Sequence, residues 1–277
     1  MLDWDAEDLI PRLQVTPVSA TEFDGVLESF GGRTFGGEIL AKAVMSAALT
    51  QPERSFHSVH ASFLRAVIPE SFVRFRVESL REGRRLSTFR VTAVQAGKQV
   101  LELHATFTAV HDGPSFDAVA QAPAVPPPDQ LPTLAQRAVA EGWEADYVTR
   151  PLDWRYVEIP WQQAPPGDPA RWRAWVRPVQ ALPAESHFHA AALVYLSDNG
   201  SFGALERRYG ERFDWSQSAS IDHAFWLHRP NIWKDWLYVE STNNITHAAR
   251  GFTETLIVGP QGQRIGFMAQ EALFGLR

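Results

Sequence analysis

The sequence contains no cysteine, and this absence excludes several kinds of chemistry at once. Without thiols the chain has no disulfide, no thiolate metal site and no cysteine nucleophile. No run of about 18 apolar residues occurs, so we expect no membrane-spanning helix. The chain starts with acidic residues and lacks a basic and then apolar leader, which argues against export. We therefore expect a soluble protein of the cytoplasm.

An excess of basic charge is also lacking, because 26 Lys and Arg residues stand against 32 Asp and Glu residues, for a net charge of −6. Nucleic acid is therefore not an expected partner. What the chain does have is apolar material, with 45% hydrophobic residues among 277. This composition is typical of a globular protein with a large core, and the length allows one large domain or two small ones.

Both halves of the chain show the same order of elements. In the first half, Gly36–Leu49 is apolar on nearly all sides and predicts a buried helix. In the second half, a helix is predicted at about residues 185–196. Strand-like runs accompany both helices. They are 56–67, 72–80, 87–95 and 100–110 in the first half, and 152–159, 170–176, 218–228, 236–241, 248–258 and 266–274 in the second.

An internal duplication explains this common order. Val77-Glu78-Ser79 matches Val239-Glu240-Ser241 at an offset of 162 residues (239 − 77), and the same offset places His60 on Asp222. An offset shared by two strands in the same element order indicates a repeat. Since strands outnumber helices, the predicted class is α+β, with two sheets that each cover a helix.

The predicted organisation is an N-terminal repeat at 1–112, a linker at 113–150 and a C-terminal repeat at 151–277. The linker is rich in Pro, Ala and Gln, and proline favours an extended surface segment. A short helix is predicted within it, around Leu134 to Glu141.

Several motifs resemble those of type II acyl-CoA thioesterases. They are GRTFGG at 32–37, HSVHASFLR at 57–65, IDHAFWLHRP at 221–230, VEST at 239–242, ARGF at 249–252 and QE at 270–271. The resemblance covers most of the chain in the same motif order, apart from the linker. It implies a double hotdog fold, in which two tandem sheets each wrap around a central helix. It also implies an acyl-CoA substrate from fatty acid metabolism, no cofactor, and assembly into a homo-oligomer.

Three residues are candidates for catalysis. Asp198 follows a buried helical run, where a carboxylate faces the negative end of the helix dipole and must turn to water or have a use. Ser220 is either an ordinary strand hydroxyl or a group that orients water, and Gln270 is an amide that needs partners in an apolar strand. The resemblance implies that Asp198 is a general base and that Ser220 and Gln270 hold the attacking water. The family commonly has threonine at the position of Ser220, so this chain keeps the hydroxyl and loses the methyl group.

Strict alternation along the strand at 218–228 predicts that Ser220 and Asp222 share one face and that His223 lies on the other. Adjacent residues point to opposite faces, so Asp222 and His223 cannot form a dyad, and we interpret both as structural. His60, the duplication mate of Asp222, is a candidate for lining the site. Glu38, at the start of a helix, suits the helix dipole or an accessory role.

Further candidates are weaker. Gly36 and Gly37 leave N–H groups at a helix start, where they are candidate donors to an oxyanion. Arg84, in a hairpin turn, is either solvated or a contact for the phosphates of coenzyme A. The His and Glu residues are too scattered to predict a metal site. No GxGxxG, P-loop or Gly-x-Ser-x-Gly motif occurs, which argues against nucleotide binding and a serine esterase.

We therefore expect an acyl-CoA thioesterase that uses water activated by Asp198, Ser220 and Gln270, without metal or covalent intermediate. Two alternatives are a non-catalytic protein that binds acyl-CoA or lipid, and another hotdog enzyme such as an enoyl-CoA hydratase. Release of a free thiol from acyl-CoA distinguishes the thioesterase from both.

Overall fold

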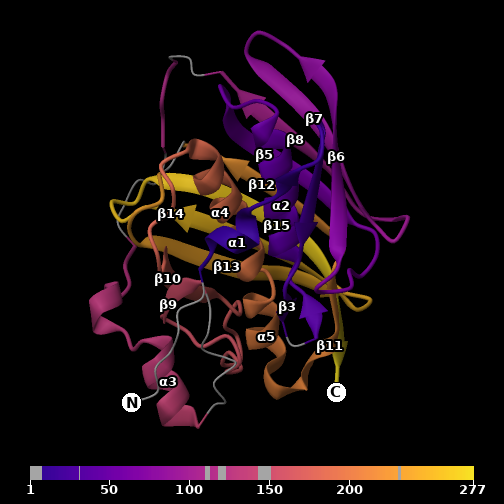
Figure 1. The fold of residues 1–277 in the computed structure, drawn as a ribbon. Helices are drawn as coiled ribbons and strands as arrows, with labels where there is room; N and C mark the ends of the chain where they lie inside the picture. Colours follow the sequence, from indigo (N-terminus) through magenta and orange to yellow (C-terminus); the bar gives the residue numbers. More distant parts are fainter. Residues whose placement is uncertain (1–7, 31, 110–112, 118–122, 143–150, 230–231) are drawn as a thin grey trace.

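The computed structural model describes residues 8–30, 32–109, 113–117, 123–142, 151–229 and 232–277. Apart from one short hairpin, the strands form one antiparallel sheet that curves around two long helices, α2 and α4 (Figure 1). The strands of this sheet are β1 (Thr16–Pro17), β2 (Glu22–Val26), β5 (Ser55–Phe63), β6 (Phe72–Glu82), β7 (Leu86–Gln95), β8 (Lys98–Thr108), β9 (Leu152–Tyr156), β10 (Trp172–Pro178), β11 (Phe213–Ser220), β12 (Asp222–Leu227), β13 (Leu237–His247), β14 (Arg250–Val258) and β15 (Arg264–Leu276). A separate hairpin consists of β3 (Ser29–Phe30) and β4 (Arg33–Thr34). The helices are α1 (Ile10–Leu13), α2 (Gly36–Leu49), α3 (Leu134–Glu141), α4 (Ser186–Asn199) and α5 (Gly203–Tyr209).

The strand order has the symmetry that the duplication predicts. Outward from the centre, the order is β5, β8, β7, β6, β2 on one side and β12, β15, β14, β13, β10 on the other. At the centre β5 pairs with β12, where Ala61 lies opposite His223. These two residues are related by the same offset of 162 (223 − 61). The predicted α+β double hotdog is confirmed, with α2 and α4 packed together inside the sheet (Figure 1). The two predicted sheets, however, join into one continuous sheet through the pairing of β5 with β12.

Both central helices are buried, as their sequences predict. Leu40 and Val44 of α2 and Leu193 and Val194 of α4 have no exposed surface. Full burial of such a side chain stabilises the fold by roughly 1.5–3 kcal/mol. The hydrophobic effect therefore holds the sheet against the two helices, and this packing brings the end of α4 close to the start of α2.

The polar side chains of α2 join a buried charge cluster. Glu38 is fully buried, 3.4 Å from the Arg12 guanidinium and 3.8 Å from the Lys42 ammonium. Lys42 Nζ also donates to the carbonyl oxygens of Pro11 and Gln14, at 2.8 and 3.0 Å. Glu38 and Lys42 therefore attach α1 and the residues after it to the central helix.

The linker contains the predicted short helix. Thr133 accepts a hydrogen bond from the Gln136 N–H, and the Gln136 side chain accepts one from the Thr133 N–H, which forms a capping box at the start of α3. The helix ends at Glu141 and is capped by Gly142, whose φ of 69° is in the left-handed region. Residues 118–122 and 143–150 of the predicted linker lie outside the described residues.

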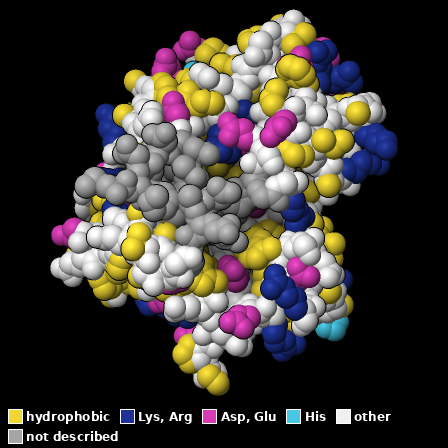
Figure 2. Space-filling view, turned by 60° about the horizontal axis from the view of Figure 1, so that its bottom comes forward, with side chains coloured by type: hydrophobic (Ala, Val, Ile, Leu, Met, Phe, Trp, Pro, Cys, Tyr) yellow, Lys and Arg dark blue, Asp and Glu magenta, His cyan; other side chains and the backbone are white. Residues whose placement is uncertain are grey.

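The described surface agrees with the balanced composition. On the face shown in Figure 2, Lys and Arg side chains are interspersed with Asp and Glu and with hydrophobic side chains. Among the described residues, no helix has the length and apolar character needed to cross a bilayer.

Candidate functional site

Asp198 lies in the last turn of α4, with its carboxylate against the first turn of α2. The Gly37 N–H donates a hydrogen bond to this carboxylate. A Cβ atom on Gly36 would lie only 2.7 Å from Asp198 Oδ2. The candidate base is 4% exposed, and it is stabilised by the positive end of a helix from the other repeat.

Gln270, on β15, connects Asp198 with Ser220. Its Nε2 atom donates to Ser220 Oγ at 2.8 Å and also to the Asp198 carboxylate. The same nitrogen lies 3.2 Å from the hydroxyl of Ser201, which itself donates to the Asp198 carbonyl at 2.8 Å. The structure therefore brings together the three residues that the sequence singled out, and it adds Ser201.

A β-bulge decides how Ser220 and its neighbours face this cluster. Ser220 pairs with Ala272 and Ala224 pairs with Ala269, so one strand has an extra residue between these pairs. The predicted continuous strand at 218–228 is therefore wrong, because it divides at Ile221 into β11 and β12. Bulges change the direction of side chains and are common near active sites.

Because of the bulge, Ser220 and His223 both contact Gln270, although strict alternation predicted opposite faces. Nδ1 of His223 lies 2.5 Å from Gln270 Oε1, and Nε2 lies 2.9 Å from the Ser197 hydroxyl. Asp222 is exposed, and its carboxylate accepts the Glu271 N–H at 3.0 Å. The expectation that Asp222 and His223 point apart is therefore confirmed, while sequence reasoning missed the contact of His223 with the cluster.

Burial controls the ionisation of the cluster. Desolvation raises the pKa of Asp198, and the nearby His223, Gln270 and Gly37 N–H oppose this effect. Desolvation also lowers the pKa of His223, against the influence of Asp198. A carboxylate with a raised pKa is a stronger proton acceptor, and a neutral imidazole can donate from one nitrogen and accept at the other.

The N-terminal repeat lacks an equivalent set of side chains. Counted from the start of each helix, Ala48 of α2 stands where α4 has Asp198. Ala61 of β5 lies opposite Leu103 of β8, whereas its duplication mate His223 of β12 lies beside Gln270 of β15, so Leu103 stands at the position of Gln270. Without a carboxylate and an amide at these positions, the described structure contains the cluster once, at the end of α4.

His60 and Arg84 are not part of the cluster. His60 is exposed on β5, with its ring centroid 5.1 Å from that of Trp226. Arg84 lies in the hairpin after β6, where the Gly83 carbonyl accepts from Arg54, just before β5 begins. Phe63, at the other end of β5, donates its N–H to Ile221 beside Ser220. Arg84 and Ser220 are therefore near opposite ends of β5, and a substrate contact by Arg84 or His60 stays a prediction.

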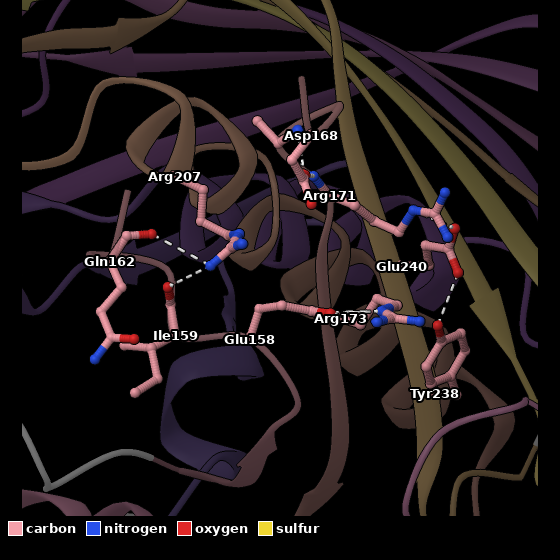
Figure 3. Close-up of polar contacts among 10 residues, drawn as sticks. Glu158, Ile159, Gln162, Asp168, Arg171, Arg173, Arg207, Tyr238 and Glu240 are labelled. Carbon is pink, nitrogen blue, oxygen red and sulfur yellow. Dashed lines mark hydrogen bonds and ion pairs between the residues drawn. The ribbon is translucent and has the colours of Figure 1, made fainter. Parts of the chain in front are cut away.

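A second polar group lies on the outer strands of the C-terminal repeat (Figure 3). Arg173 forms an ion pair with Glu158, and the Tyr238 hydroxyl donates to Glu240 at 2.7 Å. Arg207 of α5 is buried and donates to the carbonyl oxygens of Ile159 and Gln162, both at 3.2 Å (Figure 3). The two hydrogen bonds of Arg207 hold α5 against the segment after β9. Within the described residues, no group of three or more His, Asp and Glu side chains is placed to hold a metal ion.

Two models of known protein families match the chain. Residues 24–109 match the model of the acyl-CoA thioesterase N-terminal domain, and residues 123–274 match that of the acyl-CoA thioesterase C-terminal domain. The chain is 28% identical over 279 residues to acyl-CoA thioesterase 2 of Haemophilus influenzae, with 96% of each chain covered.

Solved structures are similar over nearly the whole chain. The acyl-CoA thioesterase II TesB2 of Mycobacterium marinum superposes with a TM-score of 0.79 at 27% identity, and 97% of each chain is covered. A hot dog fold protein of Alicyclobacillus acidocaldarius has a TM-score of 0.78 at 17% identity, covering 95% of this chain and 96% of its own. At that identity the second likeness shows the fold alone.

Proposed function

The chain belongs to the acyl-CoA thioesterase family and hydrolyses acyl-CoA to a free acid and coenzyme A, and from this premise we propose that Asp198, Ser220 and Gln270 activate the attacking water. The observation that carries the proposal is the Gln270 amide nitrogen, which bonds to both Asp198 and Ser220. A water molecule at this point has a carboxylate to accept its proton, together with a hydroxyl and an amide to orient it.

The reaction then proceeds by direct hydrolysis. Water attacks the thioester carbonyl carbon, and Asp198 takes a proton from it as the new C–O bond forms. The C–S bond then breaks, the acid is released, and the coenzyme A thiolate receives the proton that Asp198 accepted. This sequence requires neither a metal ion nor a covalent intermediate.

The start of α2 has two tasks in this proposal. The Gly37 N–H donates to Asp198, so it orients the base. We therefore assign only the Gly36 N–H, one position earlier in the helix, to the oxyanion that develops on the carbonyl oxygen. Donors at a helix N-terminus suit a developing negative charge.

Thiol release from a panel of acyl-CoA esters tests the proposal. Because the chain has no cysteine, a thiol-reactive dye has no background signal from the protein. Asp198→Asn is expected to lower kcat by about a hundredfold or more, the typical contribution of a positioned base. The matched control is Asp214→Asn, since Asp214 bonds to Ser216 and Gln217 on the exposed side of β11.

The outcomes separate the alternatives. An Asp198→Asn variant that keeps more than roughly a tenth of wild-type kcat would place the base elsewhere. Loss of enoyl-CoA absorbance without thiol release would indicate a hydratase, and binding of acyl-CoA without any turnover would indicate a binding protein. In the wild type, the acid limb of the pH profile is expected above the ordinary range of an aspartate, because the pKa of Asp198 is raised.

The same proposal extends to the domain division, assembly, cellular compartment and substrate source of the protein. The chain divides into repeats at 1–112 and 151–277 with a linker between them, and it assembles into a homo-oligomer. It works in the cytoplasm on acyl-CoA from fatty acid metabolism. Light scattering coupled to size exclusion measures the assembly directly, and a monomeric mass would contradict it.

A further inference from the structure

His223 is a buried titratable group for which the proposed mechanism has no task. Its side chain is 1% exposed, and both ring nitrogens have partners. Nδ1 lies 2.5 Å from Gln270 Oε1, and Nε2 lies 2.9 Å from Ser197 Oγ. Any role for His223 at this site rests on the proposed function, because its contact with the catalytic group passes through Gln270.

The hydrogen bonds of Gln270 determine which ring nitrogen carries the proton. The amide nitrogen of Gln270 donates to Ser220 at 2.8 Å and to Ser201 at 3.2 Å, on the side where the amide also lowers the pKa of Asp198, so its carbonyl oxygen faces His223. A carbonyl oxygen can only accept, and therefore Nδ1 of His223 is the donor. A neutral ring then has a bare Nε2, which accepts the Ser197 hydroxyl proton. Each group in this row therefore donates a hydrogen bond to the next one: Ser197 to His223, His223 to Gln270, and Gln270 to Asp198.

This direction matters because the two ends of an amide have nearly the same shape. A flipped Gln270 would present its oxygen to the Asp198 carboxylate, and both groups would then be acceptors. Because Nδ1–H of His223 can only donate, it favours the orientation in which the Gln270 carbonyl oxygen faces His223. We propose that His223 is a positioning residue that, together with Ser197, holds the Gln270 amide with its nitrogen toward Asp198 and Ser220.

The opposite arrangement is a definite alternative. Ser197 Oγ also lies 2.8 Å from the Val194 carbonyl oxygen. If Ser197 donates to Val194, it accepts from His223 Nε2–H, and Nδ1 must then accept from a flipped Gln270. The protonated nitrogen of His223 therefore reports the orientation of Gln270.

Histidine labelled with ¹⁵N in the full chain measures this tautomer in the absence of substrate. The chain has nine histidines, and His223→Asn identifies the signal that belongs to His223. We expect a neutral ring with the proton on Nδ1, and we expect Ser197→Ala to weaken this preference. A ring with the proton on Nε2 in the wild type would overturn the proposal.

Kinetics provide the second test. His223→Leu removes the donor and is expected to lower kcat roughly ten- to a hundredfold with a smaller change in KM, because small displacements of catalytic groups have effects of this size. His223→Asn keeps an N–H near the position of Nδ1 and is expected to recover most of kcat. The control is His189→Leu, at the other buried histidine of this repeat, whose Nδ1 accepts the Trp233 N–H at 3.0 Å.

A purely structural role predicts that His223→Leu and His189→Leu both lose stability and both keep kcat, and this result would overturn the proposal. The proposed function is tested separately by Asp198→Asn. If Asp198→Asn remains active, the proposed function fails, whatever the tautomer of His223. If Asp198→Asn is inactive while His223→Leu keeps wild-type kcat, only the role of His223 fails.

Discussion

The carboxylate of Asp198 occupies the space next to Gly36 in which any larger residue would place its Cβ atom, 2.7 Å from Oδ2. Gly36 begins α2 in the N-terminal repeat, and Asp198 lies in the last turn of α4 in the C-terminal repeat. The candidate base is therefore positioned by contact between the two repeats. This contact explains why residue 36 is a glycine, because any side chain there would collide with the Asp198 carboxylate.

Gly36→Ala is expected to lower kcat by about a hundredfold, because the new methyl group displaces the Asp198 carboxylate. Stability should change little, since alanine favours a helix over glycine by about 1 kcal/mol. Steady-state kinetics and thermal unfolding measure the two effects. Gly113→Ala is the control, as a Cβ there meets nothing within 4 Å. Wild-type kcat in Gly36→Ala would show that Asp198 need not occupy this position.

Ser220→Ala is expected to lower kcat about tenfold, because Gln270 loses an acceptor and the water loses a partner. One such hydrogen bond contributes about 1 kcal/mol, and 1.36 kcal/mol corresponds to a factor of about ten. Ser220→Thr keeps the hydroxyl and should retain activity. Ser216→Ala, at an exposed position of the same strand, is the control. Equal kcat values for the two alanine variants would contradict a role for Ser220.

Glu38 makes stability depend on pH. Burial raises its pKa to about 7, against the effects of Lys42 and Arg12. Because the folded state binds the proton more tightly, the stabilisation is complete below the unfolded pKa near 4.5 and is lost as pH rises through 7. The free energy of unfolding should fall by roughly 3 kcal/mol over this range, at 1.36 kcal/mol per unit of pKa.

Urea unfolding at several pH values measures this loss. Glu38→Gln is expected to reduce the pH dependence, and the part that remains belongs to Asp198, whose pKa is also raised; Glu53→Gln, at an exposed position, should keep the full dependence. The same pH dependence in Glu38→Gln as in the wild type would assign it to another group.

Arg207→Met is expected to lower the free energy of unfolding by about 1–3 kcal/mol, because the buried guanidinium donates to the Ile159 and Gln162 carbonyls (Figure 3). Arg171→Met is the comparison, since Arg171 is exposed and lies 3.4 Å from Glu240. An exposed ion pair contributes at most about 1 kcal/mol. Similar losses in denaturant unfolding would contradict the importance of burial.

Much of the fold was predictable because it depends on local patterns. The apolar residues of Gly36–Leu49 predicted a buried helix with the observed bounds, and the turn and periodicity signals placed most strands within a few residues. The strand at 218–228 is the informative exception. Alternation assumes a regular pleat, and the bulge at Ile221 breaks that assumption where the site is formed.

The sequence by itself determined the buried helices, the duplication and the residues of catalytic type, because burial and periodicity are encoded within short segments. Only the tertiary structure decided which of these residues meet. The contact of Gly37 with Asp198 depends on how two distant helices pack, and the contact of His223 with Gln270 depends on a bulge between paired strands. Both arise from the geometry between segments, which a pattern within one segment does not contain.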